Sequence, residues 1–556
     1  MRKLLPVLLC LLPFLSKAQQ NPALEDSLKR ELSKATTSEK KVDILSDLSR
    51  ILMNTNIPEA DKYGKLLLQE AELSRDRKLM VKALLTNGER YSYFGSIKDY
   101  NQKSINYYNQ ALDLARKNDL DAERAETLLR LSAVYRQVPE LDKAFNYASQ
   151  ASSIISTLDN SDSLKVMVSI SLGNVYQDKK DRLLALRNYL NALTLAEEMK
   201  KKNSSLLRSC YYTLCNFYSG IKEYDKAIDY AKKAMDQLST MEKEKEKKEG
   251  VKYSRVVDLY SLGNLYLVKK DFDMSQYFYE ASIKLADSIK YEPLKMPGYN
   301  GLLNQYLREK QPQKALTYFN TNPILKKYIT NFGMGQVIDE AYGVIYSDLG
   351  RFDSAKYYFE KAKPQYERIS TPSGKMSFYA AYAGFLNKAG DTRSAIDYFL
   401  QAKSLAEQTS DLESQENIAK ELDSAYAKIG DYRQSYAFNN LHSKLKDSLQ
   451  KLGEEKDLMQ MELKDEELRK ARLDKEREEE VKRKHDLQYT AIAISIGVIF
   501  TLLVLLGAFR VSEATIKIVG FFAFILLFEF IILLADNRIH DWTHGEPLPV
   551  LSIKII

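Results

Sequence analysis

The chain has 556 residues, with 82 Lys and Arg against 75 Asp and Glu, and its formal net charge is +7. No basic face stands out from this mixed charge, so the sequence does not predict nucleic-acid binding. Gly and Pro are scarce while Tyr is abundant at 37, a composition that suits packed helices with aromatic contacts.

Residues 1–18 form a segment of their own. The segment is basic at Arg2, almost wholly apolar over residues 4–15, and small at Ala18. This pattern predicts a secretory signal with cleavage after Ala18. The apolar run is too short for a comfortable membrane anchor. Cys10 leaves a lipoprotein signal as the alternative, although large apolar residues stand before it where such a signal prefers small ones.

Residues 24–450 carry a pattern that recurs every 40 to 44 residues, with one longer gap of 48. One series of positions holds Tyr306, Tyr346, Leu386 and Tyr426, and nine residues after each come Ala315, Ala355, Ala395 and Ser435. An earlier unit reads Leu172-Gly173-x-x-Tyr176, then Ala185, Tyr189 and Ala192. The small residue and the first Tyr share one face of a first helix, and the later trio shares one face of a second. A fixed period of this size predicts a solenoid of about ten stacked units.

This unit resembles the tetratricopeptide repeat, a helix–turn–helix with a small residue, an aromatic, and then a second small–aromatic–small series. The resemblance implies an all-α superhelix whose first helices line a concave groove for protein or peptide partners. In the family the residue after the small position faces that groove, and here it is Asn174, Asn216 and Asn264. In related peptide-binding repeats an Asn at this place bonds to the peptide backbone, although Asn is also simply common there. The lysines of a carboxylate clamp are not evident.

Two interruptions divide the repeats. Residues 241–252 alternate Lys and Glu and predict an exposed helical extension. Pro293 and Pro297 predict a break in the chain, with a seam near residues 291–298. On another predicted helix, Cys210 and Cys215 lie about 140° apart, so we interpret them as small buried residues rather than a redox pair.

Residues 451–487 predict a long charged helix. A heptad seam enters it from the last repeat and contains Leu445, Leu449, Leu452, Met459, Leu463 and Leu473. The same seam also contains charged residues such as Lys456 and Glu466. Both a homodimeric coiled coil through residues 445–473 and a solvated stalk therefore remain open.

Residues 489–509 carry no charge and are long enough for a first transmembrane helix. The polar loop 510–517 then leads to a second apolar run, 518–535. The basic run at 482–484 favours a cytoplasmic position for the preceding segment, whereas the signal predicts export. We follow the signal, because large domains translocate largely regardless of local charge. The repeats are then expected in the periplasm of a bacterium, held at its inner membrane.

Polar residues in and after the second apolar run are candidate sites. Glu529 is an intramembrane carboxylate, either a working group or a protonated side chain bonded to a neighbouring helix. His540 and His544 have a metal-compatible spacing if helical, but Gly545 and nearby Pro favour a polar turn. Residues 536–556 therefore read as a polar turn and an apolar tail.

The sequence shows no phosphate-binding Gly loop, no hydrolase nucleophile elbow and no strong Cys/His metal spacing, so we predict a protein that is not an enzyme and needs no cofactor. The first hypothesis is a membrane-anchored scaffold or adaptor. The order of segments also resembles the sensory half of bacterial receptors of the Bacteroidetes type. The second hypothesis is therefore a signal transducer that relays through the 445–487 helix, with its output module absent or truncated. An enzyme subunit truncated at the C-terminus is a third.

Overall fold

The computed structural model describes residues 22–53, 56–92, 98–138, 140–159, 161–199, 202–243, 248–290, 292–331, 334–369, 371–409, 411–506, 512–525 and 527–528. The chain separates into two compact units, Met1–Lys456 and Asp457–Ile556, which are described one at a time. Over the described residues the regular structure is helical, without a strand. The prediction of an all-α protein is confirmed.

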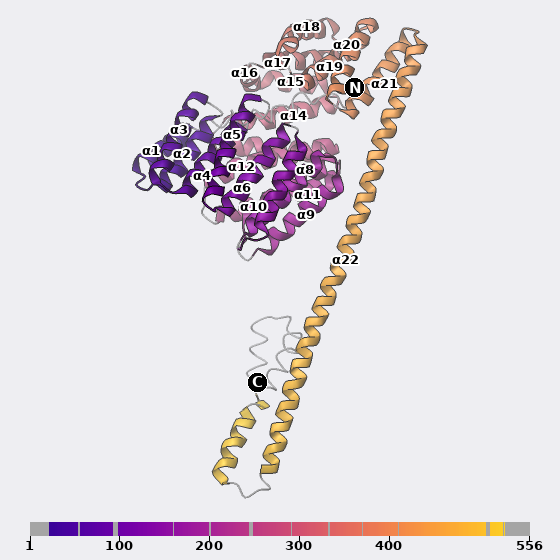
Figure 1. Cartoon of the computed structure of the whole chain (residues 1–556). Coiled ribbons are helices and arrows are strands. Elements are labelled where there is room, and N and C mark those ends of the chain that lie inside the picture. The colour runs from indigo at the N-terminus through magenta and orange to yellow at the C-terminus, as the bar shows by residue number, and fades with distance from the viewer. Residues whose placement is uncertain are drawn as a thin grey trace. The chain divides into compact units, whose positions relative to one another are not determined.

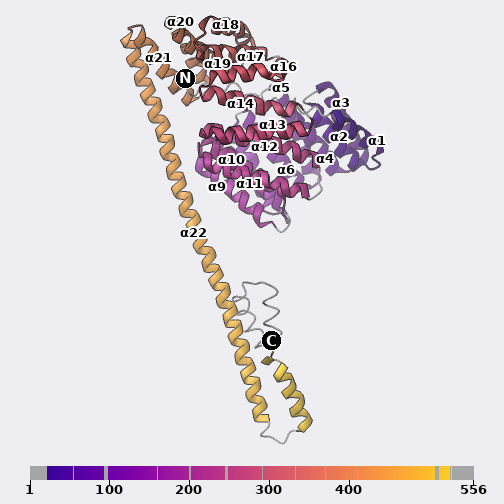
Figure 2. The same ribbon diagram turned by 180° about the vertical axis from the view of Figure 1, so that it is seen from behind.

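The first compact unit is an array of helical pairs, visible from opposite sides in Figures 1 and 2. It starts with α1 (Pro22–Lys34). The first helices of its ten repeats are α2 (Ser38–Met53), α4 (Arg77–Ser92), α6 (Asp121–Gln137), α8 (Asp162–Asp178), α10 (Ser204–Gly220), α12 (Lys248–Lys269), α14 (Met296–Arg308), α17 (Gly335–Asp348), α19 (Pro372–Ala389) and α21 (Leu412–Lys428). The second helices are α3 (Ile57–Ser74), α5 (Lys98–Lys117), α7 (Leu141–Ile155), α9 (Arg182–Glu198), α11 (Tyr224–Lys243), α13 (Phe272–Ser288), α15 (Pro312–Thr321), α18 (Phe352–Ile369), α20 (Thr392–Gln408) and the start of α22 (Tyr432–Leu506). The predicted tandem repeats are confirmed.

An aromatic ring lying on a glycine joins the two helices of several repeats. A Cβ added at Gly173 would lie 2.5 Å from the ring of Tyr189, and one added at Gly263 would lie 2.6 Å from the ring of Tyr279. Real Cβ atoms do not come so close to another heavy atom, so only glycine permits this approach. Both rings are almost fully buried. The small residue that recurs in the sequence thus leaves space for the aromatic ring of the second helix.

The turn between the two helices has a fixed geometry. In the seven repeats whose turn lies among the described residues, the residue before the second helix's N-cap is left-handed, with φ of 67°, 65°, 69°, 58°, 72°, 97° and 82° at Lys180, Lys222, Lys270, Lys310, Gly350, Gly390 and Gly430 respectively. The next residue is often an Asp that caps the second helix. Asp181 accepts from the Leu184 amide at 3.0 Å, and Asp271 from the Met274 amide at 3.2 Å. The capping carboxylate pairs an amide that the first helical turn leaves without a partner.

The first helices form the inner layer of the array. Neighbouring first helices contact one another directly, as α2 does with α4, α6 with α8 and α12 with α14. Neighbouring second helices share no comparable contact among the described residues. Because the more closely spaced layer lies on the inside of a curved stack, the first helices face the concave side.

Two departures from regularity lie around the seventh repeat. A short 3₁₀ helix, η2 (Glu292–Lys295), precedes α14 at the predicted seam. The second helix of this repeat is also divided, because α15 ends at Thr321 and α16 (Pro323–Asn331) begins two residues later. Proline has no amide hydrogen and clashes with the preceding turn, which explains the division at Pro323. The sequence analysis did not predict this second break.

The last repeat is polar where the others are apolar. The Ser435 hydroxyl donates to Asp423 at 2.6 Å, and the Asn439 amide donates to the same carboxylate at 3.0 Å. His442 lies 3.2 Å from Glu416. Asp423 stands where most other repeats have a glycine or another small residue, and Asn439 stands where the fourth, sixth and seventh repeats have the rings of Tyr189, Tyr279 and Phe319. Hydrogen bonds therefore replace the ring-on-glycine contact where α22 joins the array.

The cysteines agree with their interpretation as packing residues. Cys210 and Cys215 are free and buried. Burial raises the pKa of the two thiols to about 12 and about 11 respectively. Neither is a thiolate near neutral pH, so neither has the reactivity of a redox cysteine.

Several predictions concern residues beyond the array. Among the described residues, no helix has both the length and the apolar character that a membrane crossing requires. Many side chains of 489–509 and the end of 518–535 are not among the described ones. The predicted signal 1–18, Glu529, and the segment 536–556 with His540 and His544 lie outside the described residues altogether. The pairing predicted through 445–473 stays a prediction.

The left-handed turn yields a stability test. Lys270→Gly is expected to raise the free energy of unfolding by roughly 1 kcal/mol, because glycine adopts a positive φ without steric cost. Gly390→Ala should lower it by a similar amount for the same reason. Urea denaturation followed by circular dichroism measures both. Gly220→Ala is the control, since Gly220 is helical and an added Cβ meets open space there. Equal effects at Gly390 and Gly220 would contradict the explanation.

Candidate functional site

The three predicted groove residues lie in the inner layer. Asn174, Asn216 and Asn264 stand on α8, α10 and α12, each two residues before the tyrosine that ends its repeat motif. Asn216 is exposed, and the other two are half-buried. The same face of three successive first helices therefore presents an amide.

A fourth amide continues this row. Asn304 on α14 stands forty residues after Asn264 and two residues before Tyr306. The sequence analysis missed it because Leu303 occupies the position that was searched for a small residue. The spacing Asn-x-Tyr, shared by all four repeats, was the signal that could have found it. We call Asn174, Asn216, Asn264 and Asn304 the amide row.

Tyrosines of the second helices orient two members of the row. The Tyr279 hydroxyl donates to Oδ1 of Asn264 at 2.7 Å, and the Tyr189 hydroxyl lies 2.8 Å from Oδ1 of Asn174. Burial raises the pKa of both phenols, so both stay protonated as donors. With its oxygen engaged, each of these amides has N–H groups to offer a partner.

The other two members have no such tyrosine. The corresponding second-helix residues are Ala231 in the fifth repeat and Phe319 in the seventh. Asn216 therefore keeps an unconstrained amide at the surface. Asn304 is only 6% exposed, and its Oδ1 has no hydrogen-bond partner among the described residues. A buried acceptor without a donor costs roughly 1–3 kcal/mol, so Asn304 would gain from a donor that a ligand supplied.

The charged groups beside the row neutralise one another. Arg208 on α10 pairs with Asp258 on α12 at 2.6 Å, and the Tyr212 hydroxyl donates to the same carboxylate. The guanidinium also lies over the Tyr212 ring, 4.6 Å from its centroid. Burial raises the pKa of Asp258, and the hydrogen bond from Tyr212 and the charge of Arg208 oppose that shift. This cluster ties α10 to α12 and leaves no net charge there.

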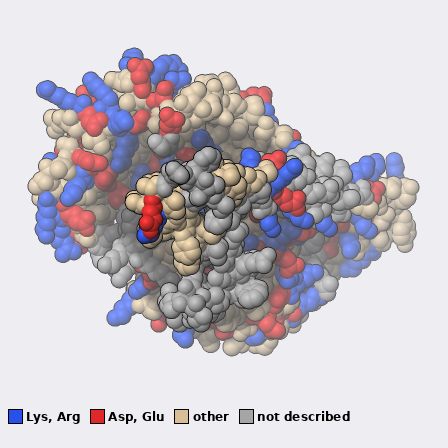
Figure 3. Space-filling view, turned by 90° about the horizontal axis from the view of Figure 1, so that it is seen from below, with Lys and Arg blue, Asp and Glu red and all other residues tan. Residues whose placement is uncertain are grey.

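The amide row is confined to the middle of the array. In the first two repeats the equivalent positions hold Arg50 and Glu89, which pair at 3.1 Å. In the eighth and ninth they hold Val344 and Gly384. The middle repeats thus offer a neutral, amide-bearing inner surface between sections of other chemistry. Figure 3 shows, from below, acidic and basic side chains intermixed over the described surface on that side.

A buried carboxyl group lies beyond the row on α17. Glu340 is 5% exposed and accepts a hydrogen bond from the Tyr366 hydroxyl. Burial raises its pKa to about 7, and the Tyr366 hydrogen bond partly offsets the shift. Glu340 therefore gains a proton near neutral pH.

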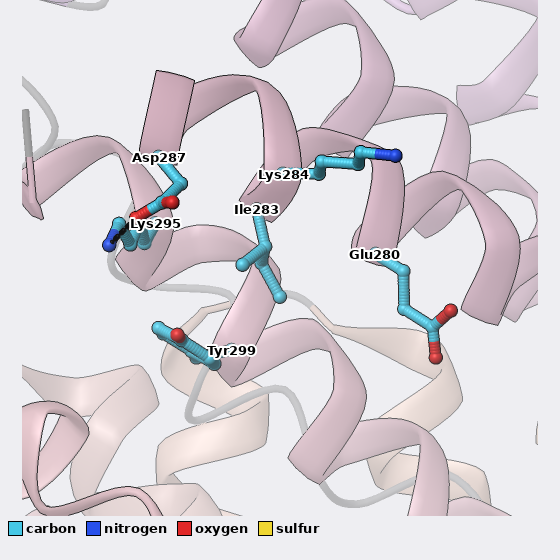
Figure 4. Close-up of a pocket in the computed structure, with 6 residues that line it drawn as sticks. All are labelled: Glu280, Ile283, Lys284, Asp287, Lys295 and Tyr299. Carbon is cyan, nitrogen blue, oxygen red and sulfur yellow. Dashed lines mark hydrogen bonds and ion pairs between the residues drawn. The ribbon is translucent and has the colours of Figure 1, made fainter. Parts of the chain in front are cut away.

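One cleft accompanies the predicted seam. It has a volume of about 390 Å³ and is lined by Glu280, Ile283, Lys284, Asp287, Lys295 and Tyr299. Figure 4 shows these side chains arriving from α13, η2 and α14, with Lys295 paired to Asp287. The lining charges are mixed and mostly exposed, and no set of acid, base and nucleophile converges there. Among the described residues, no group of His, Cys, Asp and Glu is arranged to hold a metal ion.

Comparison with known proteins shows a similarity to the tetratricopeptide repeat. The tetratricopeptide repeat family model matches residues 341–363, from α17 into α18. No curated protein matches the chain. A solved Rap protein complexed with Competence and Sporulation Factor is 14% identical, covers 67% of this chain and 99% of its own, and gives a TM-score of 0.43. A tetratricopeptide repeat protein from Parabacteroides merdae is 16% identical over 50% of this chain and 93% of its own, at 0.37. A signal transduction ATPase from Pyrococcus horikoshii with a tetratricopeptide repeat sensor is 14% identical over 69% and 55%, at 0.46.

The pKa of Glu340 predicts how stability depends on pH. Folding raises this pKa from its ordinary 4.5 to about 7, so the protonated form is favoured in the folded chain. Its stabilising contribution is complete below pH 4.5 and is lost as the pH rises through 7, a change on the order of 3 kcal/mol. Melting curves from pH 5 to pH 8 should show a falling Tm, and Glu340→Gln should flatten that fall. An unchanged pH profile in the variant would contradict the assignment.

Proposed function

We propose that the amide row binds an extended polypeptide segment of a protein partner, and that the chain is a scaffold or adaptor rather than an enzyme. The observation that carries the proposal is the recurrence of Asn at one inner position in four successive repeats, α8 to α14. An amide side chain matches a peptide group, because it can donate to a carbonyl and accept from an N–H. Amides at regular intervals on a concave face suit a ligand that itself repeats, as an extended backbone does.

The surroundings of the row support a peptide rather than a small molecule. The row crosses four repeats, whereas the cleft at α13 and α14 is small and has mixed charge. Tyr279 fixes the direction of the Asn264 amide before any ligand arrives, and the Tyr189 hydroxyl lies 2.8 Å from both Asn174 and Gln177. Preorganised donors lose less entropy on binding than free side chains do.

We propose further that the array is exported and anchored in a bacterial inner membrane. The support comes from the residues themselves: the basic and then apolar pattern of 1–18, and the uncharged stretch 489–509. The amide row would then face the periplasm. The order of segments also resembles the sensory region of receptors of the Bacteroidetes type.

One observation favours signal transduction as a second candidate. α22 runs from Tyr432 to Leu506 as one helix, and its first turns serve as the second helix of the last repeat. A change in that repeat would act on the helix without an intervening loop. The polar contacts of Asp423 and Glu416 hold this helix more weakly than buried rings would, because water can replace polar contacts.

Replacing the amides tests the first proposal. The full-length protein would be used to select from a phage-displayed library of random 12-residue peptides, and enriched peptides would be measured by fluorescence polarisation. Asn216→Ala and Asn264→Ala should each weaken binding roughly 2- to 10-fold, the value of one neutral hydrogen bond. Asn146→Ala on the exposed side of α7 is the matched control. Peptides that bind the wild type and an Asn174/Asn216/Asn264/Asn304 alanine variant equally would refute the proposal.

A reporter fusion tests the placement. Alkaline phosphatase joined after residue 450 should be active, because it folds only after export, and green fluorescent protein at the same point should be dark. Fusions from which residues 1–18 are removed provide the control and should show the opposite pattern. Activity only of the fluorescent fusion in the intact chain would place the array in the cytoplasm and end this proposal.

A further inference from the structure

Arg308 lies one helical turn after Asn304, at the end of α14. It is partly buried, and among the described residues it has neither an ion pair nor a hydrogen bond. Residues four apart on a helix are neighbours, so its side chain and Asn304 share a face. The phenol of Tyr279, which orients Asn264, is also close enough to act on its charge. Arg308 therefore belongs to the end of the amide row.

Other shielded arginines of the array have carboxylate partners. Arg90 is bound by Asp61 at 2.7 Å, Arg136 by Asp178 at 2.6 Å, and Arg208 by Asp258 at 2.6 Å. Arg308 is the exception among them. Burial lowers its pKa, but a guanidinium keeps its charge at any physiological pH. A partly desolvated charge without a counter-ion is unfavourable, and a carboxylate from outside would relieve it.

We propose that Arg308 receives a carboxylate of the bound segment, and that the part of the segment lying over α8 to α12 is uncharged. This inference rests on the peptide-binding function proposed above and specifies its ligand. Beside the row from Asn174 to Asn264, the buried charges of Arg208 and Asp258 pair with each other and so do not compensate a charge on the ligand. A charged residue there would lose its hydration without gaining a partner. At α14, by contrast, a negative charge on the ligand would gain Arg308 as a partner.

The carboxylate has two sources, an acidic side chain within the segment or the C-terminus of the partner. Both present a planar group with one negative charge, which a guanidinium can bind through two parallel hydrogen bonds. Asn304 would contribute an amide beside the same group. The lysines of a carboxylate clamp are not evident in the sequence, whereas the structure supplies an arginine that has no ion pair or hydrogen bond among the described residues.

Peptide selection on the full-length protein tests the proposal. Peptides enriched from the random 12-residue library should share an uncharged stretch and one acidic group at a fixed distance from it. Synthetic versions would replace that acid by its amide or block the C-terminal carboxylate. One of the two changes should weaken binding at least 10-fold with the wild type and have no effect with Arg308→Gln, and which one does identifies the source. Lys310→Gln, two residues further on an exposed turn, is the charge-matched control and should behave as the wild type.

The outcomes separate this inference from the function on which it rests. If binding depends on the amide row but both modified peptides lose the same affinity with the wild type and with Arg308→Gln, the carboxylate site is refuted and the groove remains. If the binding of every selected peptide is independent of the amide row, the proposed function itself is refuted. Thermal melting of the unliganded variants adds a structural check. Arg308→Gln should leave Tm unchanged or raise it, and a fall of several degrees would show that Arg308 has an internal partner and overturn the inference.

Discussion

The seating of an aromatic ring on a glycine is the contact on which this architecture depends. Where Tyr189 lies over Gly173 and Tyr279 over Gly263, the two helices of a repeat approach more closely than any side chain on the first helix would allow. That approach fixes the pair as a unit, and the first helices of successive units then meet along one layer. The close approach of the two helices also places the amide row, because in three of its four repeats the Asn comes directly after the small residue of the first helix.

The same two tyrosines pack the helical pairs and also contact the amide row. Each ring fills the space above a glycine, and each hydroxyl reaches the amide on the next residue of the first helix. One side chain thus stabilises the pair and orients a group at the inner surface. In the fifth and seventh repeats Ala231 and Phe319 take this place, and there the amides are unconstrained or lack a donor. In the fourth and sixth repeats one side chain therefore both packs the helical pair and contacts an amide of the row, whereas in the fifth and seventh no described side chain does both.

Most of the fold could be predicted from the periodicity of the sequence, because small and aromatic residues recur at spacings that only stacked helical pairs satisfy. Local breaks were harder to foresee: Pro293 and Pro297 were recognised, but Pro323, which divides the second helix of the seventh repeat, was not. Asn304 was missed because Leu303 replaces the small residue used to align the repeats. Arg308 was beyond sequence reasoning, since the absence of a partner becomes visible only when neighbouring repeats are in place. The roles of Glu529, His540 and His544 stay predictions, because these residues lie outside the described part of the chain.

The continuity of α22 with the last repeat has a mechanical consequence. A helix of 75 residues is about 110 Å long at 1.5 Å per residue. Its first turns are held in the last repeat by the hydrogen bonds that Ser435 and Asn439 donate to Asp423. Exchange of these two hydrogen bonds for bonds to water would release the start of the helix at a small cost in free energy, whereas release of a buried ring would expose apolar surface.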